Sequence, residues 1–207
     1  MEIIAHRGFL EGPTKPVDGQ LASALSLGFG VEFDIRDSSD GIVLAHDPWE
    51  SAPVPLGRFL STLPTTGSLA INIKSCGLAS RLRKELDAHG VGLARCFCFD
   101  MAVPDHLAYP KNGLPAYARL SEVEPLGEFA LQADGIWLDA FQSTWWDDAL
   151  VVRLLQRGLK VCLVSPELHR RDRGPAWDTI KKAGLGVHAG LSLCTDYPRE
   201  ARSFFAS

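Results

Sequence analysis

Several features that would assign a protein to a class at once are missing from this sequence. No run of about twenty apolar residues occurs in the 207-residue chain, which excludes a helix that spans a membrane. The opening residues, MEIIAHRG, have neither the basic region nor the long apolar stretch of a signal peptide, so we expect a cytoplasmic protein. The formal net charge is −4, which gives the chain no overall attraction for nucleic acid.

Cysteine is sparse and follows no metal-binding pattern. The five cysteines are an odd number, and their spacing does not resemble that of a zinc site. Reduced thiols are the rule in cytosolic proteins, and a free cysteine behaves as a small apolar residue. We therefore expect buried, unpaired thiols at Cys76, Cys96, Cys98, Cys162 and Cys194.

Linkers, repeats and low-complexity segments are also absent, so residues 1–207 are expected to form one domain. The chain instead alternates short apolar runs with helical patterns. The predicted strands are Glu2–Ala5, Val31–Ile35, Ile42–Ala45, Leu69–Ile73, Cys96–Phe99, Ala116–Leu120, Gly135–Leu138, Val161–Val164 and Gly186–Leu191. The predicted helices are Gln20–Leu27, Leu78–His89, Pro104–Ala108, Trp145–Arg157 and Pro175–Ala183, and several end at a glycine that suits a helix C-cap.

Strand–helix alternation over a whole chain predicts an α/β protein with a parallel sheet and helices outside it. Asp40-Gly41 is a turn signal between the second and third runs, which makes that pair a hairpin. Removing one run from the nine leaves eight, the number of strands in a (β/α)8 TIM barrel. An open doubly wound sheet is the alternative, but no glycine-rich phosphate loop follows the first strand.

Four polar residues stand in or directly after the first three of these runs. Glu32 and Asp34 share one face of their strand, because strand side chains alternate with period two. Two carboxylates on one face suit a hard divalent cation, and the neighbouring His6 and His46 suit acid–base chemistry. Each of the four is also common as a structural or solvated side chain, so it is their grouping that favours a functional site.

In a TIM barrel the active site forms at the carboxyl ends of the strands. The predicted barrel strands end in side chains that ionise or form hydrogen bonds: His6-Arg7, Glu32, Asp34, Asn72, Lys74, Asp100, Arg119, Ser121, Asp139, Ser165, Glu167 and Thr195-Asp196. Lys74 and Arg119 can equally be charges of the barrel rim. We expect substrate contacts from Arg119, Trp137 and Asp139, and also from Trp49, which is expected near the same end of the barrel.

These residues resemble the glycerophosphodiester phosphodiesterase family. The matching words are IAHRG, VEFDIRDSSDGIVLAHDP, INIK and CTDYP, which stand in the family's order and span nearly the whole chain. The spacing is also similar to that of the sphingomyelinase D group and, more distantly, of bacterial phosphatidylinositol-specific phospholipase C. The resemblance implies a TIM barrel that cleaves a small phosphodiester, such as a glycerophosphodiester, with a divalent cation. Mg²⁺ and Ca²⁺ are the first candidates and Mn²⁺ is a further one.

The resemblance also implies roles for single residues. His6 and His46 are the expected acid–base pair, Glu32 and Asp34 the expected metal ligands, and Arg7 and Lys74 the expected contacts to the phosphoryl oxygens. The family's third metal ligand is an acid, where this chain has Asn72. An amide oxygen also binds Mg²⁺ or Ca²⁺, but with less charge.

Two further departures concern the loops. The family's Pro-Glu-Asn-Thr word is replaced by GPTKPVDG at positions 12–19, and a tryptophan expected near the seventh strand's end is replaced by LVSPELH. The alternatives to a hydrolase therefore stay open: a lyase that releases a cyclic phosphate, a weakened relative that only binds a phosphorylated ligand, or a Schiff-base enzyme. The last would use Lys74, which would need a neutral amine.

Overall fold

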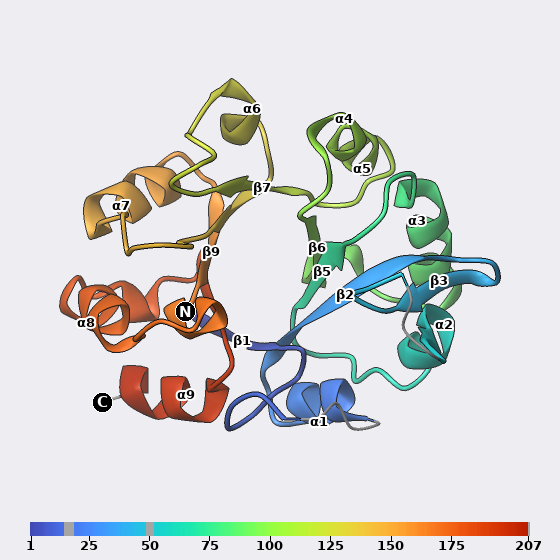
Figure 1. Ribbon diagram of the computed structural model, residues 1–207, viewed down its shortest axis with the longest axis horizontal. Coiled ribbons are helices and arrows are strands. Elements are labelled where there is room, and N and C mark those ends of the chain that lie inside the picture. The colour runs from blue at the N-terminus through green and yellow to red at the C-terminus, as the bar shows by residue number, and fades with distance from the viewer. Residues whose placement is uncertain (15–18, 49–51, 207) are drawn as a thin grey trace.

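The structure is a computed structural model that describes residues 1–14, 19–48 and 52–206. Eight strands run parallel and close into a barrel (Figure 1). In chain order they are β1 (Glu2–His6), β2 (Gly30–Ser38), β5 (Leu69–Ile73), β6 (Cys96–Phe99), β7 (Tyr117–Leu120), β8 (Gly135–Leu138), β9 (Lys160–Val164) and β10 (Leu191–Thr195).

The ring of strands is closed, although one seam is thin. β1 pairs with both β2 and β10, which joins the first and last strands of the chain. The seam between β6 and β7 consists of the bridge from Cys98 to Ala116 and a 2.8 Å hydrogen bond from the Cys98 amide to the Pro115 carbonyl. This closure confirms the predicted (β/α)8 barrel over the open doubly wound sheet.

The hairpin predicted at Asp40-Gly41 lies outside the ring. β3 (Gly41–Leu44) runs antiparallel to β2, with Ser38 paired to Gly41. A further strand, β4 (Val54–Pro55), pairs with β3. A strand of two residues cannot show a period of two, which is why the sequence pattern does not predict β4.

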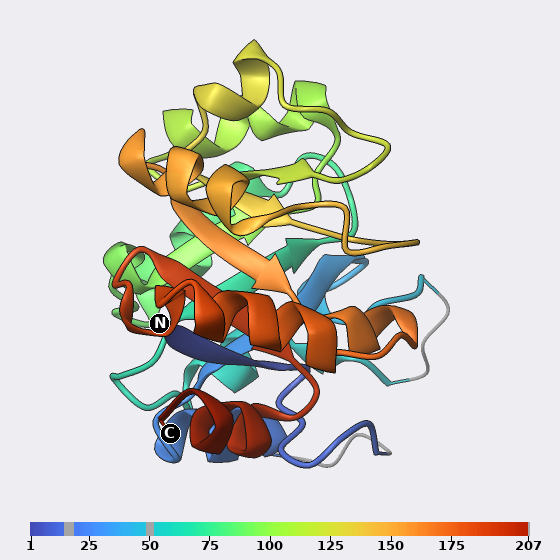
Figure 2. The ribbon, with the colours of Figure 1, turned by 90° about the vertical axis from the view of Figure 1, so that its left-hand side faces the viewer.

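Helices cover the outside of the barrel (Figures 1 and 2). They are α1 (Gln20–Ser26), α2 (Leu56–Leu60), α3 (Ala79–Ala88), α4 (Val103–His106), α5 (Ala108–Lys111), α6 (Glu128–Leu131), α7 (Asp148–Gln156), α8 (Gly174–Lys182) and α9 (Pro198–Ala206), with 3₁₀ turns η1 (Leu93–Arg95), η2 (Pro166–His169) and η3 (Leu185–Val187). The predicted helices are present near their predicted bounds, one of them split into α4 and α5. The sequence pattern missed α2, α6 and α9, and the first two are too short to show a helical period. None of the described helices could cross a membrane.

One predicted strand is wrong. The run Gly186–Leu191 is not a strand, because Leu185–Val187 forms the turn η3 and Val187 is 87% exposed. The strand at this place is β10, which begins at Leu191. Its register explains the shift: pairing with the neighbouring strands begins at Leu191, opposite Val161, and Ser192, opposite Glu2.

Aromatic side chains fill the barrel interior. Phe97 stacks on Tyr117 with ring centroids 4.1 Å apart, and Phe99 stacks on Trp137 at 3.8 Å. The interior is therefore packed core and not a channel, as is usual for eight-stranded barrels. All five cysteines are free thiols, and the prediction of burial holds for four of them but is wrong for Cys76, which is exposed.

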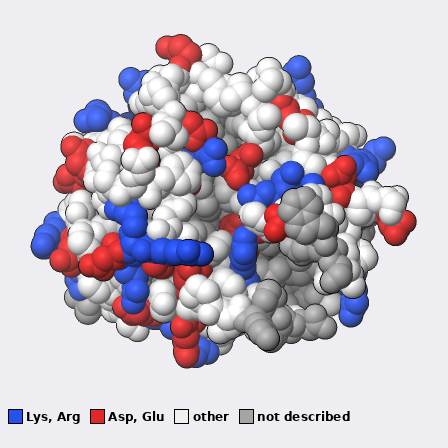
Figure 3. All heavy atoms as spheres, viewed as in Figure 1, with Lys and Arg blue, Asp and Glu red and all other residues white. Residues whose placement is uncertain are grey.

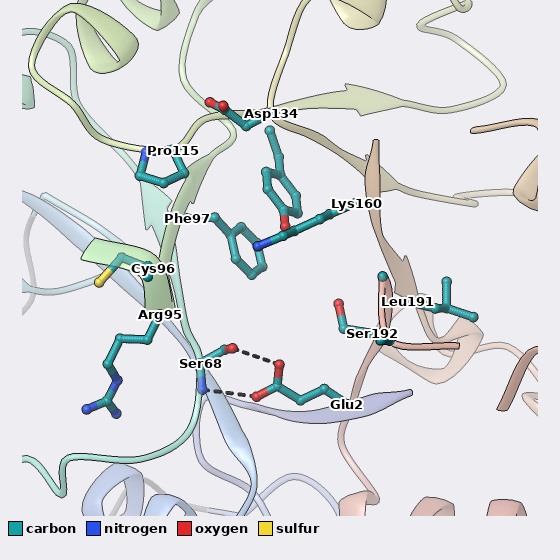
Figure 4. A pocket seen from close by; sticks show the side chains of 14 residues that line it. Glu2, Ser68, Arg95, Cys96, Phe97, Pro115, Asp134, Lys160, Leu191 and Ser192 are labelled. Carbon is teal, nitrogen blue, oxygen red and sulfur yellow. Dashed lines mark hydrogen bonds between the residues drawn. The ribbon is translucent and has the colours of Figure 1, made fainter. Parts of the chain in front are cut away.

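A cavity of about 240 Å³ opens at the amino-terminal end of the barrel (Figure 4). Its lining includes Glu2, Lys160 and Ser192, which stand at or near the first positions of β1, β9 and β10. Glu2 accepts hydrogen bonds from the Ser68 amide at 3.0 Å and the Ser68 hydroxyl at 2.7 Å. The polar residues predicted at the carboxyl ends do not line this cavity, so it is separate from the candidate site.

Candidate active site

The polar residues at the carboxyl ends of the strands gather at the opposite end of the barrel. Acidic and basic side chains surround a central hollow on the face shown in Figure 3. In barrel order this end, the mouth of the barrel, carries His6 and Arg7, Glu32 and Asp34, Asn72 and Lys74, Asp100, Arg119, Asp139, Glu167 and Asp196. The structure therefore brings most of the predicted site residues to one place.

His6, the last residue of β1, is held between two carboxylates. Its Nδ1 lies 2.7 Å from Asp196 Oδ1, and its Nε2 lies 3.7 Å from Glu32 Oε2. An ionised carboxylate only accepts hydrogen bonds, so Nδ1 carries the proton and Nε2 is the basic atom. Burial lowers the pKa of His6, but the Asp196 hydrogen bond and the charge of Glu32 outweigh it and leave the pKa raised.

The turn after His6 explains the word His-Arg-Gly. Arg7 has a φ of 51°, a conformation that costs a non-glycine residue about 1 kcal/mol or more. The turn directs the Arg7 amide to Glu32 Oε2 at 3.3 Å and its guanidinium to Asp34 Oδ2 at 3.3 Å. Gly8 follows with a φ of 75° and packs on the backbone at the start of α1, where a Cβ would lie 3.0 Å from the carbonyl carbon of Gln20. The strained turn thus places the Arg7 guanidinium against Asp34 and the Arg7 amide against Glu32.

Three oxygen-bearing side chains on β2 and β5 form a buried cluster. Asp34 pairs with Asn72 across the two parallel strands, and Asn72 Nδ2 donates to Glu32 Oε1 at 3.2 Å. Asp34 Oδ1 and Asn72 Oδ1 are buried and make no hydrogen bond. Burial raises the pKa of Glu32, and the charge of Asp34 raises it further, against the lowering effects of His6 and Arg7.

Glu32, Asp34 and Asn72 are the residues whose side-chain oxygens could hold a divalent cation. Buried oxygens that accept no hydrogen bond are costly, and a hard cation that prefers oxygen ligands would satisfy them. Among the described residues, no three His, Cys, Asp or Glu side chains converge as a metal site requires. The candidate set therefore depends on the amide of Asn72 together with Glu32 and Asp34.

A chain of ion pairs runs from this cluster along the mouth. Lys74 Nζ lies 3.5 Å from Asp34 Oδ1 and 3.1 Å from Asp100 Oδ2. Arg119 binds Asp100 at 2.6 Å and Glu124 at 2.5 Å. Asp100, like Arg7, has a positive φ, 72°. Lys74 is engaged in ion pairs with two carboxylates, which disfavours the Schiff-base hypothesis.

His46 lies on the rim, next to β2. The Ala45 amide donates to the Asp34 carbonyl at 3.2 Å, so the following residue leaves the hairpin beside the carboxylate strand. The His46 side chain is 45% exposed, and its Nδ1 lies 3.1 Å from Asp47 Oδ1. Arg36 donates to the His46 carbonyl at 3.2 Å. Trp49, which also had a predicted substrate contact, lies outside the described residues.

Two other predicted contacts, Trp137 and Asp139, lie on β8 and directly after it. Trp137 is 5% exposed and stacks on Phe99 within the barrel. Asp139, also buried, lies 2.6 Å from His169 Nε2, a pairing that the sequence pattern missed. His169 ends the 3₁₀ turn η2 inside the LVSPELH segment, and the only sequence signal was its position just after a strand end.

The remaining strand-end residues bind one another. Glu167 accepts hydrogen bonds from the hydroxyls of Ser165 and Thr195 and, at 3.1 Å, from the Asp196 amide. Ser121 donates to Glu124 at 3.2 Å. These contacts fix the loops that carry Asp196 and Arg119.

No family model matches the sequence, and no curated protein matches it either. Solved structures do match. A glycerophosphodiester phosphodiesterase from Agrobacterium tumefaciens str. C58 is similar over 100% of this chain and 100% of its own, with 15% identity and a TM-score of 0.69. One from Parabacteroides distasonis ATCC 8503 is similar over 99% of this chain and 96% of its own, with 16% identity and a TM-score of 0.67. The chain has the fold of these phosphodiesterases.

The same fold also carries other chemistry. Phosphoribosyl anthranilate isomerase from Thermus thermophilus is similar over 100% of this chain and 97% of its own, at 13% identity, with a lower TM-score of 0.54. Because one fold hosts many reactions, the function has to be argued from the residues at the mouth.

Proposed function

We propose that this protein is a phosphoric diester hydrolase that acts on a small glycerophosphodiester-like molecule. The observation that carries the proposal is the position of His6. Its Nδ1 is held by Asp196 at 2.7 Å, and its basic Nε2 faces the Glu32 carboxylate beside Arg7 and Lys74. An oriented base next to cations is the arrangement that phosphodiester hydrolysis requires.

Each of these residues has a part in the proposed reaction. Arg7 and Lys74 bind the nonbridging phosphoryl oxygens, where negative charge grows as the ester is attacked. His6 Nε2 takes a proton from the attacking water, while Asp196 keeps the ring oriented. A general acid gives a proton to the leaving oxygen, and the family resemblance assigns that part to His46.

Glu32, Asp34 and Asn72 are the residues that would hold a divalent cation, Mg²⁺ or Ca²⁺ first and Mn²⁺ as a further candidate. Two buried oxygens without a hydrogen bond, Asn72 Oδ1 and Asp34 Oδ1, support this assignment, although the second also forms an ion pair with Lys74. When bound, such a cation supplies positive charge that stabilises the nonbridging oxygens. We also propose a cytoplasmic location, because all five cysteines are free thiols.

A binding function without turnover is the second candidate, and one observation favours it. Asp34 is already paired with two cations, Arg7 and Lys74, and Asn72 adds no charge. This balance suits a bound phosphate group better than a bound metal ion. A lyase that stops at a cyclic phosphate would use the same residues.

Incubation of the protein with glycerophosphocholine and Mg²⁺, Mn²⁺ or Ca²⁺ distinguishes the three candidate functions by their products. We expect wild type to release a phosphomonoester, seen by phosphorus NMR, and His6→Ala to lose at least about 100-fold in rate. A cyclic phosphate as the final product would identify a lyase. Binding by calorimetry with no turnover over long incubation would identify a binding protein. Full activity of His6→Ala would contradict the role given to His6.

A further inference from the structure

His169 and Asp139 form a second histidine–carboxylate pair at the mouth. Nε2 of His169 lies 2.6 Å from Oδ1 of Asp139, which is 4% exposed. The carboxylate only accepts, so Nε2 carries the proton of this bond, and Nδ1 is the atom left for proton exchange. Nδ1 of His169 has no hydrogen-bond partner within residues 1–14, 19–48 and 52–206, and the side chain is 25% exposed. One nitrogen is thus fixed while the other is free.

The loops around β8 and β9 hold this ring in place. Arg171, two residues after His169, donates to the Ala140 carbonyl at 2.7 Å. The Ala140 amide donates to Asp139 Oδ1 at 2.8 Å, and the Phe141 ring meets the His169 ring edge-on at 4.8 Å. On the rim, by contrast, His46 and its partner Asp47 are 45% and 51% exposed. A buried carboxylate orients an imidazole far better than a solvated one does.

The position of the pair relative to the carboxylate cluster follows from the strand order. β8 is four strands from β2 in either direction around the closed ring, so Asp139 stands across the mouth from Glu32 and Asp34. An eight-stranded barrel is only wide enough for side chains to fill. A phosphodiester that spans this mouth, with its nonbridging oxygens at Arg7 and Lys74, would have an ester oxygen on the side where Asp139 binds His169.

We propose that His169 is the acid that protonates the leaving oxygen, the part that the resemblance gives to His46. This inference rests on the proposed hydrolase function. In the step, the oxygen of water bonds to phosphorus while its proton goes to His6 Nε2. The bond from phosphorus to the leaving oxygen breaks, and the proton on His169 Nδ1 moves to that oxygen, which departs as a neutral alcohol. Solvent then returns the two histidines to their starting forms.

Two substrates with different leaving groups test this role. The choline of glycerophosphocholine leaves as a poorly stabilised alkoxide and needs a proton, whereas the nitrophenolate of bis(p-nitrophenyl) phosphate is stable without one. We expect His169→Ala to lower kcat for glycerophosphocholine about 100-fold or more, with little change in KM. For the nitrophenyl diester the loss should be below about threefold. Asp139→Asn changes only the group that orients the ring. It should also lower kcat more for glycerophosphocholine than for the nitrophenyl diester, but by a smaller factor than His169→Ala.

His46→Ala is the matched control, because the same two substrates then compare the two candidate acids directly. Equal losses of His169→Ala on both substrates would assign His169 a structural role and overturn the proposal. A selective loss in His46→Ala with none in His169→Ala would overturn it as well. Should His169→Ala fail to fold, His169→Gln is measured in the same way, since the glutamine amide can donate a hydrogen bond but is too weak an acid to transfer a proton. A wild type inactive on both substrates would instead reject the hydrolase function itself.

Discussion

The Nδ1 atom of His6 lies 2.7 Å from Oδ1 of Asp196, and this contact joins the first strand of the barrel to the loop after the last. The two residues are 190 positions apart in the chain. The orientation of the proposed base His6 therefore depends on closure of the whole barrel. Asp196 is itself held in place by the hydrogen bond from its amide to Glu167.

Asp196→Asn tests this relationship. An amide in place of the carboxylate can present its NH₂ group to Nδ1 and favour the opposite tautomer, in which Nε2 is no longer basic. We expect hydrolysis of glycerophosphocholine to fall about 10- to 100-fold with little loss of stability. Steady-state kinetics and a thermal unfolding curve on the same sample measure both. Unchanged kcat would mean that Asp196 does not orient the base.

Asn72→Asp tests the proposed cation site. The substitution restores a negative charge beside Glu32 and removes the hydrogen bond that Asn72 now donates to it at 3.2 Å. Without metal we expect the variant to be less stable than wild type, because two like charges are buried together. With Mg²⁺ we expect about tenfold tighter binding by calorimetry, since ligand charge sets affinity for hard cations. Asn72→Ala, which removes the oxygen, should bind Mg²⁺ more weakly, and an affinity equal to wild type in both variants would exclude Asn72 as a ligand.

The pKa of His6 predicts how stability changes with pH. Burial lowers this pKa, but the Asp196 hydrogen bond and the Glu32 charge raise it above the ordinary value of 6.5. A raised histidine pKa stabilises the fold fully below 6.5, and that contribution is lost as pH rises through the folded-state value. Burial also raises the pKa of Glu32 above its ordinary 4.5, which likewise makes the fold less stable as pH rises.

Denaturant unfolding of wild type and His6→Gln in EDTA measures this effect. We expect the stability advantage of wild type to be larger at about pH 5.5 than at about pH 8. Because the charge of His6 also lowers the pKa of Glu32, the difference between the two proteins reports on the histidine together with its interaction with Glu32. An advantage that grows toward high pH would show that the folded-state pKa of His6 is lowered instead.

The strands were predictable wherever a short apolar run is buried on both faces. Leu69–Ile73 is buried at every position and has its predicted bounds. The last strand was misplaced because its start is set by pairing with Glu2 and Val161, which no local pattern records. Short helices such as α6, with four residues, were missed because one turn shows no period.

The same distinction applies to the candidate site. Glu32, Asp34 and Asn72 could be placed together because β2 and β5 are adjacent and their residues alternate faces. The partners of the histidines could not be predicted. Asp139 and His169 are 30 residues apart and meet through the direction of a 3₁₀ turn, which the LVSPELH segment does not reveal.

Gly8→Ala tests whether the turn after β1 must be glycine. Gly8 has a φ of 75°, and a Cβ there would lie 3.0 Å from both the Gln20 carbonyl carbon and the Leu21 amide nitrogen, which are backbone atoms and cannot rotate away. Gly158 is the matched control, because its φ is 81° but a Cβ would have no atom within 4 Å. The two alanine variants therefore share the left-handed backbone and differ in the collision.

We expect Gly158→Ala to cost about 1 kcal/mol in unfolding free energy, the penalty of the backbone conformation alone. Gly8→Ala should cost about 3 kcal/mol, because α1 must also move away from the turn. That movement shifts Arg7, whose amide and guanidinium contact Glu32 and Asp34, so kcat should fall in Gly8→Ala and not in Gly158→Ala. Equal losses of unfolding free energy in the two variants would mean that α1 moves away from the added Cβ at no cost. Glycine at position 8 would then be required only for its left-handed backbone conformation.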